Sequence, residues 1–393
     1  MTRQIPKISA IIPAAGLSTR MHEYKPLLKL GRLTIIEHTI GIFKKCKIND
    51  IIVVTGHNHK RIQPVIQDAG ARSVFNKDFK TGMLGSIKTG VRNISPESVG
   101  FLLLPVDIPL VRPSTLKSII SIANKNPEHI IIPEFNKEPG HPPFIPAWLI
   151  PEILKLEDDS NMGRLLLSLK KNQKKHLVHD STILMDADTP KAYEILKEKY
   201  KTIDIPDKNE CLSIINTNLN KEKNIQSHVK LVAKTAMTLA RAVMAKPVKT
   251  NPGKNQAGVI DLDLDLDLDL IYAGALLHDI KRKEINHAKS GAQYLLSLGF
   301  PKIADIISQH MDLSLPLSAD LTETQIIYFA DKLCNGAMLE PDLDFSRRFK
   351  EKIRQTPHAK EIIVKRHEHT KIIQTRIENI VKQPIKSILS MLI

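Results

Sequence analysis

Cysteine is scarce in this chain of 393 residues, which has only three. Cys46, Cys211 and Cys334 lie far apart and form no CxxC pair. Solitary thiols give no disulfide framework, and this fits a reducing compartment. We therefore expect a cytoplasmic protein.

Long apolar runs are missing as well. No stretch of about 18 apolar residues occurs, so the sequence predicts no membrane-spanning helix. The N-terminal segment MTRQIPKISAIIPAAG lacks a signal-like apolar core followed by a small-residue cleavage site, and its short apolar run is typical of a first strand. We expect no membrane partner.

Acidic residues are in the minority: 57 Lys and Arg stand against 42 Asp and Glu, which gives a net charge of +15. Nucleic-acid binding is one interpretation of this balance. However, aromatic residues make up only 4% of the chain and are not interleaved with basic ones. We favour polyanionic nucleotides as substrates and expect no nucleic-acid partner.

The first half alternates strand-like and helix-like stretches from Ile8 to about Tyr200. The apolar runs predicted as buried parallel strands are Ile8–Ile12, Ile51–Thr55, Phe101–Pro105 and Ile130–Pro133. This alternation predicts an open, mostly parallel α/β sheet with helices on both faces. Ligands bind such sheets beyond the carboxyl ends of the strands, which is where the motifs described next fall.

One loop organises this half, IIPAAGLSTRMHEYKPLLKL, residues 11–30. Its small residues Ala14, Ala15 and Gly16 allow a ligand to approach the backbone closely. Arg20 offers a planar fork of donors and Lys25 a mobile point charge, and both suit phosphate oxygens. Such a loop between a strand and a helix favours a nucleoside triphosphate. It has neither the Gly-Lys-Ser/Thr end of a P-loop nor the repeated glycines of a dinucleotide loop.

The same stretch resembles the signature of the molybdenum-cofactor nucleotidyltransferase family, the MobA-like NTP transferases, which reads roughly (L/P)-A-(A/G)-G-x-S-x-R-M-G-x-x-K. The matching positions are Ala14, Ala15, Gly16, Ser18, Arg20, Met21 and Lys25. His22 stands where the family usually has glycine. The double alanine is closer to the cytidylyl-transferring branch than to the guanylyl-transferring one, so the resemblance implies CTP.

A second segment, NKDFKTGMLGS at residues 76–86, resembles the family's N-x-x-(F/Y/W)-x-x-G-M-x-x-S. An Asn side chain offers donors and an acceptor to a base edge, and a glycine permits close contact. The resemblance implies nucleotide contacts from Asn76, Gly82 and Ser86. For Ser86 an equal alternative is the cap of a helix over residues 86–93.

Asp107 follows the buried run in FLLLPVDIPLV. A carboxylate at the tip of a central strand is costly to bury unless it meets a cation. Nucleotidyl transfer needs Mg²⁺ to neutralise triphosphate charge, and the family's matching Asp is a metal ligand. The family's D-x-D-T-P motif adds Asp186 and Asp188. One of these acids should assist Asp107, because period-2 spacing puts both on one strand face. The alternative for Asp107 is the start of a turn with Pro109.

Gly140, His141 and Pro142 resemble the family's G-H-P segment, which lines the acceptor site. With a turn around residues 158–164, the resemblance spans about residues 5 to 200. It implies nucleotidyl transfer with Arg20, Lys25 and Asp107 as the catalytic residues. The acceptor is already a phosphate oxygen, so positioning and charge neutralisation can carry the rate without a protein base.

Residues 203–222, rich in Lys, Asp and Asn, are predicted as a linker between domains over 1–202 and 223–393. The second domain begins with HVKLVAKTAMTLARAVM, whose apolar residues recur at helical spacing, and is predicted to be all helical. A low-complexity stretch that ends in DLDLDLDLDL is predicted as a loop insertion over 246–270. The tail, 345–393, should form amphipathic helices on the helical core, and membrane-surface binding is the less favoured alternative.

The second domain holds a spaced set of metal-competent side chains: His228, His278, Asp279, His287, His310 and Asp331. The context LLHDIKR resembles the defining motif of HD-domain phosphohydrolases. In that resemblance the ligands of one divalent metal are His228, His278, Asp279 and Asp331. His287 and His310 resemble the additional histidines of a dinuclear subset. Such ligands suit Fe, Mn, Co, Ni or Zn, which would activate a water and shield a phosphate. Lys281 is either a phosphate contact or a solvated lysine.

The sequence as a whole predicts a bifunctional enzyme. The first domain would transfer a nucleotidyl group from an NTP, with CTP expected, to a molybdopterin-type cofactor and release pyrophosphate. The second would hydrolyse a phosphomonoester or nucleotide, and a molybdoenzyme or its chaperone would be a fitting partner. Two alternatives stay open: a sugar- or alditol-phosphate acceptor for the first domain, and a nucleotide-sensing regulatory protein without turnover.

Overall fold

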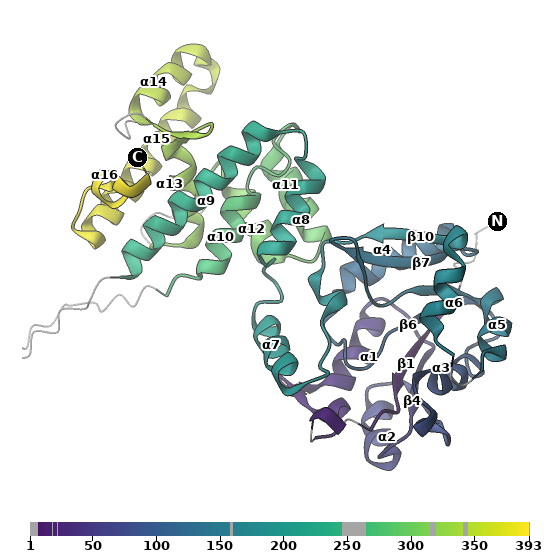
Figure 1. The fold of residues 1–393 in the computed structure, drawn as a ribbon. Coiled ribbons are helices and arrows are strands. Elements are labelled where there is room, and N and C mark those ends of the chain that lie inside the picture. Colours follow the sequence, from purple (N-terminus) through teal and green to yellow (C-terminus); the bar gives the residue numbers. More distant parts are fainter. Residues whose placement is uncertain are drawn as a thin grey trace, which may run out of the picture. The chain divides into compact units, whose positions relative to one another are not determined.

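The computed structural model describes residues 7–17, 19–21, 23–157, 160–245, 265–314, 320–340 and 345–392. The chain divides into two compact units, Met1–Ile203 and Asp204–Ile393 (Figure 1). Each unit has its own buried apolar core. No helix among the described residues is long and apolar enough to cross a membrane.

The first unit is built on a mostly parallel open sheet, as predicted. Among the described residues, eight strands form it in the order β10-β7-β9-β6-β1-β4-β5, with β8 paired to β7. Their bounds are β1 Lys7–Ala14, β4 Ile51–Thr55, β5 Arg72–Phe75, β6 Ser98–Leu103, β7 Ile130–Phe135, β8 Glu138–Pro139, β9 Phe144–Pro146 and β10 Gln173–Leu177. Only β8 and β9 run antiparallel to their neighbours. The four predicted strands are β1, β4, β6 and β7. A separate hairpin joins β2 Lys29–Leu30 to β3 Leu33–Thr34.

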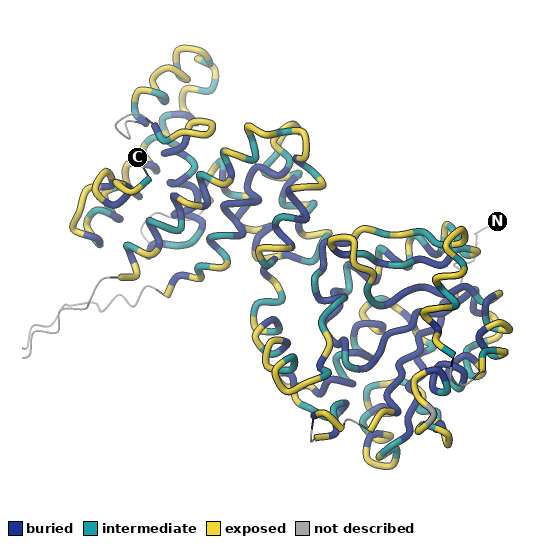
Figure 2. Tube along the Cα trace, viewed as in Figure 1, coloured by how far each residue is buried: buried dark blue, intermediate teal, exposed yellow. Residues whose placement is uncertain are grey.

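Helices cover both faces of this sheet because its central strands are apolar on both sides. Along β1, Ala10 and Ile12 belong to one core cluster, and Ile11, between them, belongs to the other. The first cluster includes helices α1 Ile35–Lys45, α2 His59–Asp68 and α4 Pro113–Lys125, and the second includes α3 Met83–Val91, α5 Ile150–Lys155 and α6 Met162–Ser168. Figure 2 shows β1, β4 and β6 as the most deeply buried part of the unit.

The last helix of the first unit, α7 (Pro190–Lys201), begins as the sequence predicts. The Thr189 side chain accepts a hydrogen bond from the Ala192 backbone N–H, and Pro190 occupies the first helical position, where no N–H is needed. Short 3-10 turns connect the larger elements: η1 Thr19–Met21, η2 Lys25–Leu27, η3 Phe79–Thr81, η4 Ala147–Leu149, η5 Lys170–Asn172 and η6 Ser181–Leu184. The loops after β1, β4 and β6 leave the same edge of the sheet, since these strands are parallel.

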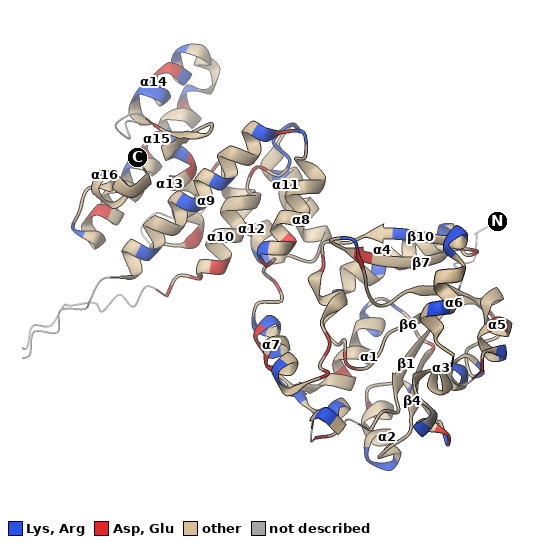
Figure 3. Cartoon of the chain, in the orientation of Figure 1, with Lys and Arg blue, Asp and Glu red and all other residues tan. Residues whose placement is uncertain are grey.

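The second unit is helical. Its helices are α8 Lys208–Asn218, α9 Lys223–Met244, α10 Leu268–Leu277, α11 His287–Ser297, α12 Pro301–Gln309, α13 Glu323–Leu333, α14 Phe345–Gln355, α15 Lys360–Val381 and α16 Ile385–Ile388, with a small hairpin of β11 Cys334–Asn335 and β12 Met338–Leu339 and 3-10 turns η8 Pro357–Ala359 and η9 Ser390–Leu392. Helix α9 packs against α10 and α13, and α11 packs against α12. Figure 3 shows Lys and Arg spread over helices of both units, in keeping with the scattered lysines of the sequence.

The prediction of a linker over 203–222 is wrong, because this segment contains α8. Asp207 and Glu210 form a capping box that starts the helix. Cys211, Ile214 and Ile215 are buried in the core of the second unit. The helix is short and mostly polar, so its few apolar residues gave no long run to detect.

The predicted insertion lies mainly outside the described residues, which resume at Asp265. Residues 268–270, the end of the predicted insertion, form the first turn of α10, whose start is capped by the Asp267 side chain. The tail forms the predicted amphipathic helices. Phe345 and Phe349 on α14, and Ile373 on α15, are buried in the core of this unit.

Removal of one partner from a buried ion pair should strongly destabilise the first unit. Arg112 Nη1 donates to Asp180 Oδ1 at 2.5 Å, and both side chains are at most 3% exposed. Thr115 and Thr182 hydroxyls also donate to Asp180. Asp180→Ala leaves the arginine buried without its counter-ion, so we expect a loss of about 3–5 kcal/mol in the free energy of unfolding.

Urea unfolding followed by tryptophan fluorescence measures this loss. The chain has one tryptophan, Trp148, and it lies in the first unit, so the signal reports on that unit alone. The matched control is Glu97→Ala, which removes an exposed partner of Lys7 and should cost less than about 1 kcal/mol. Equal losses in the two variants would contradict the assignment.

Candidate active sites

In the first unit, Lys25 joins two acids from distant parts of the chain. Its Nζ donates to Asp188 Oδ1 at 2.7 Å and to Asp107 Oδ2 at 3.1 Å. Arg20, which is mostly exposed, reaches Asp188 Oδ2 at 3.4 Å. Thus the loop after β1, the loop after β6 and the segment before α7 meet at one point.

The electrostatics of this group follow from burial and pairing. Burial lowers the pKa of Lys25, but hydrogen bonds and charges from Asp188 and Asp107 outweigh it and raise the pKa above its usual value. Burial raises the pKa of Asp107, and the Lys25 ammonium offsets only part of that rise. The hydrogen bond from Lys25 instead lowers the pKa of Asp188. Two carboxylates this close favour a cation between them.

The expectation that Asp186 and Asp188 share one strand face is wrong. Both lie in irregular backbone between η6 and α7, where period-2 alternation does not apply. Asp188 faces Lys25, whereas Asp186 Oδ1 accepts the Asp188 backbone N–H at 3.0 Å. Asp188 therefore stands beside Asp107, and Asp186 holds the turn.

A cavity of about 330 Å³ opens beside Lys25. The predicted nucleotide-binding residues that line it are Ala14, Ala15, Gly16, Lys25, Gly82 and Ser86, together with Asp107. Arg20 and Asn76 do not line it. Asn76 is buried and donates from Nδ2 to Ser86 Oγ at 3.3 Å, so it supports the cavity wall. Lys80, an exposed cation, also lines the cavity, but the family signature over residues 76–86 has no fixed residue at its position.

The alternative that Ser86 caps a helix is wrong. Helix α3 begins at Met83, after Gly82, whose φ of 108° suits glycine. Ser86 lies within the helix and faces Asn76.

The predicted acceptor residues lie between β8 and β9. His141 Nδ1 is 3.2 Å from the Leu103 carbonyl oxygen at the end of β6. Burial lowers the pKa of His141, and the Asp107 charge opposes this, which places the motif close to the acid. A Cβ added to Gly140 would meet the Ile183 side chain at 2.6 Å, so this close packing requires glycine. Gly140, His141 and Pro142 do not line the 330 Å³ cavity.

In the second unit, the six predicted ligands come from five helices or helix ends. His228 lies on α9, His278 and Asp279 follow α10, and His287 starts α11. His310 ends α12, and Asp331 lies on α13. The structure brings all six together, as the distances between them show.

Asp279 links two groups of histidines. Its Oδ2 lies 3.7 Å from His228 Nε2 and 3.6 Å from His278 Nε2. Its Oδ1 lies 3.3 Å from His287 Nε2 and 3.6 Å from His310 Nε2. In each group the ligand atoms lie within 4.8 Å of one another. One carboxylate therefore offers an oxygen to each of two adjacent cation positions.

Asp331 completes the first group. Its Oδ1 lies 3.1 Å from His228 Nε2 and 3.6 Å from His278 Nε2. Burial raises the pKa of Asp331, but the Lys332 charge and the two histidines outweigh it and hold the pKa well below its usual range. In Asp279, too, the His278 charge and hydrogen bonds from His287 and His310 outweigh burial and lower the pKa. Both carboxylates are thus ionised, as metal ligands must be.

The rings are oriented for coordination by Nε2. Nδ1 lies 3.0 Å from a backbone carbonyl oxygen in His228, 2.8 Å in His278 and 2.7 Å in His310. A carbonyl only accepts, so Nδ1 carries a proton, which leaves Nε2 as the nitrogen that can coordinate a metal. Nε2 of His278 is buried and has no hydrogen-bond partner among the described residues. Imidazole nitrogens and carboxylate oxygens arranged this way fit divalent transition metals.

Two cations beside this centre were not singled out from the sequence. Arg282 Nη1 lies 3.3 Å from Asp279 Oδ1, and Lys332 Nζ lies 2.6 Å from Asp331 Oδ2. Lys281, which the sequence offered as a phosphate contact, instead lies 3.4 Å from Glu284 Oε1 and over the ring of Tyr294. LLHDIKR contains Arg282, and Lys332 directly follows Asp331, but sequence position alone does not tell which side chain faces the proposed ligands.

Metal content provides a direct test of the shared carboxylate. We expect the full chain, stripped with chelator and reloaded with Mn²⁺, to bind two ions. His287→Ala should keep one, because the group of His228, His278 and Asp331 stays intact. Asp279→Ala should weaken both sites by at least about a hundredfold, since each position loses an anionic ligand. Two ions retained in His287→Ala, or unchanged affinity in Asp279→Ala, would contradict the arrangement.

Comparison with known proteins identifies a domain in each unit. Residues 10–175 match the family model of the MobA-like NTP transferase domain, and residues 225–336 match that of the HD domain. The chain is 28% identical over 198 residues to the molybdenum cofactor cytidylyltransferase of Escherichia coli strain K12, which covers 50% of this chain and 98% of that protein.

Two further relatives are more distant. The chain is 24% identical over 199 residues to the Bifunctional protein GlmU of Francisella tularensis subsp. novicida, which covers 50% of this chain but only 43% of GlmU. It is 22% identical to a nucleotidyl transferase from Methanothermobacter thermautotroptrophicus, with a TM-score of 0.45, covering 50% of this chain and 99% of that one. The two family matches show that this chain carries a MobA-like NTP transferase domain followed by an HD domain.

Proposed function

We propose that the first unit transfers a cytidylyl group from CTP to a molybdopterin-type cofactor and releases pyrophosphate. The observation that carries this proposal is the meeting of Lys25, Asp107 and Asp188, of which Lys25 and Asp107 line the 330 Å³ cavity. Lys25 could bind triphosphate oxygens there, and the two carboxylates within hydrogen-bond distance of it could hold the counter-ion of the triphosphate. The 28% sequence identity to a molybdenum cofactor cytidylyltransferase supports CTP and this acceptor. The double alanine, Ala14-Ala15, also supports CTP.

The geometry suggests how the residues share the work. The nucleoside lies against the small residues of the loop after β1, with Gly82 allowing close approach. Lys25 and Arg20 hold phosphate oxygens, and the acceptor phosphate comes from the side of His141. Asp107 and Asp188 would hold Mg²⁺, which when bound neutralises triphosphate charge. Because the acceptor oxygen is already anionic, positioning and charge neutralisation supply the catalysis.

We propose that the second unit is a metal-dependent phosphohydrolase acting on a phosphomonoester or nucleotide. The two groups that share Asp279 would hold a dinuclear centre, which would supply an activated water. Arg282 and Lys332, beside Asp279 and Asp331, are positioned to bind substrate phosphate oxygens.

The acid substitutions give the sharpest test of the transfer reaction. Pyrophosphate release is measured with each of the four NTPs, Mg²⁺ and molybdopterin cofactor, and then with a sugar phosphate or alditol phosphate as acceptor. We expect release with CTP and molybdopterin. Asp188→Ala and Asp107→Ala should each lower the rate by at least about a hundredfold, because charge stabilisation is lost.

Asp186→Ala is the matched control, since its carboxylate supports the turn and does not face Lys25. It should lower the rate by less than about tenfold, and Trp148 fluorescence checks that every variant is folded. Equal effects at Asp186 and Asp188 would contradict the assignment. Pyrophosphate release with sugar or alditol phosphates alone would show that one of these, and not molybdopterin, is the acceptor. Nucleotide binding without pyrophosphate release from any NTP would favour a nucleotide sensor.

The hydrolase proposal predicts that His278→Ala lacks phosphatase activity. The substrates are p-nitrophenyl phosphate and nucleoside monophosphates, with Mn²⁺ present. Loss of a buried ligand should lower the rate by at least about a hundredfold, whereas Lys289→Ala, an exposed position on α11, should leave it unchanged. Phosphatase activity that survives His278→Ala would contradict the site.

A further inference from the structure

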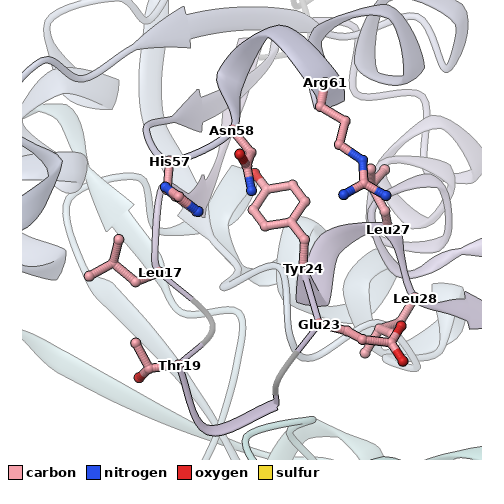
Figure 4. Close-up of a pocket in the computed structure, with 9 residues that line it drawn as sticks. All are labelled: Leu17, Thr19, Glu23, Tyr24, Leu27, Leu28, His57, Asn58 and Arg61. Carbon is pink, nitrogen blue, oxygen red and sulfur yellow. The ribbon is translucent and has the colours of Figure 1, made fainter.

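A second cavity, of about 460 Å³, lies in the first unit next to the nucleotide cavity. Its walls come from the loop after β1 and from the turn that leads from β4 into α2, as Figure 4 shows. The polar residues that line it include Thr19, Tyr24, His57, Asn58 and Arg61. None of the predicted nucleotide or acceptor residues lines this cavity.

The two cavities are separated by a short stretch of chain. Lys25 lines the nucleotide cavity, and the preceding residue, Tyr24, lines the second one. Leu17 contributes to both. A ligand in the second cavity would therefore contact the residue next to the proposed catalytic lysine without occupying the nucleotide's place.

Tyr24 has an unsatisfied polar group here. Its side chain is only 8% exposed, and its hydroxyl has no hydrogen-bond partner among the described residues. Burial raises the pKa of Tyr24 to about 12, although the Arg61 charge opposes the rise, so the hydroxyl keeps its proton and can donate. A buried hydroxyl without a partner is costly, and a ligand oxygen would satisfy it.

Arg61 adds a cation without an assigned partner. Its exposed side chain forms no ion pair or hydrogen bond with the part of the chain that the structure describes. Figure 4 shows its guanidinium descending from α2 beside the Tyr24 ring, with His57 and Asn58 on the other side of that ring. The His57 and Tyr24 rings meet edge to face, with centroids 6.2 Å apart. Asn58 and Thr19 add polar groups to the lining of the cavity.

We propose that this cavity is a binding site for a small molecule that carries an oxyanion, either a phosphate or a carboxylate. The Tyr24 hydroxyl and the Arg61 guanidinium donate to the anionic oxygens, a pairing for which a planar fork of N–H groups is suited. The size of the cavity admits a ligand larger than the anion itself. Glu23 is exposed and also lines the cavity, so its negative charge would repel a ligand that carries negative charge along its whole length.

Calorimetric titration of the full chain with inorganic phosphate, and separately with acetate, tests this site without any turnover. Tyr24→Phe removes the hydroxyl and keeps the ring, and Arg61→Gln removes the cation. Each should weaken anion binding by at least about tenfold. Lys60→Gln, an exposed neighbour on α2 that does not line the cavity, should bind as the unmodified chain does.

Lys80→Gln separates the two cavities, because Lys80 lines only the nucleotide cavity. Binding that survives this substitution and weakens in Tyr24→Phe and Arg61→Gln supports the proposal. Phosphate binding without acetate binding then assigns a phosphorylated ligand, and comparable binding of both assigns either oxyanion. Unchanged binding in Tyr24→Phe and Arg61→Gln, or a loss confined to Lys80→Gln, overturns it.

Discussion

The first unit depends on the position of one ammonium group. Lys25 Nζ lies between Asp107 and Asp188, which are 81 positions apart in the sequence, so the loop after β1 is fixed against two other segments. A parallel sheet makes this possible, because it delivers the ends of β1 and β6 to the same edge. The low exposure of Lys25 and Asp107, 12% and 19% of their side chains, strengthens the pairing relative to an ion pair in water. The same charges that hold the loop suit a triphosphate and its cation.

In the second unit, carboxylates and not an ammonium group lie at the centre of the charged side chains. Asp279 is buried and Asp331 is half-buried among histidines, and their ionised carboxylates need positive charge nearby. Backbone carbonyls hold three of the histidine rings so that Nε2 faces the carboxylates. Arg282 and Lys332 add fixed charge at the edge of the group. The same packing of five helices thus gathers the proposed metal ligands and the two cations beside them.

Much of this could be predicted from the sequence, and the exceptions share a cause. Buried strands such as Ile51–Thr55 and the ligands His278 and Asp279 stand in strong local patterns, so their structural setting could be predicted. The period-2 spacing of Asp186 and Asp188 did not predict which of them faces Lys25, because both lie in irregular backbone. The start of α3 at Met83 and the presence of α8 depend on a glycine conformation and on tertiary burial, which apolar periodicity does not register. Arg282, and not Lys281, reaches the proposed HD ligands because both residues lie in the turns between α10 and α11, whose backbone path cannot be predicted from the motif.

We propose that one chain holds two independent active centres. This is tested by assaying pyrophosphate release and phosphate-ester hydrolysis side by side in Asp188→Ala and Asp279→Ala. We expect Asp188→Ala to lose only pyrophosphate release and Asp279→Ala to lose only hydrolysis. Loss of both activities in either folded variant, or of neither, would contradict it.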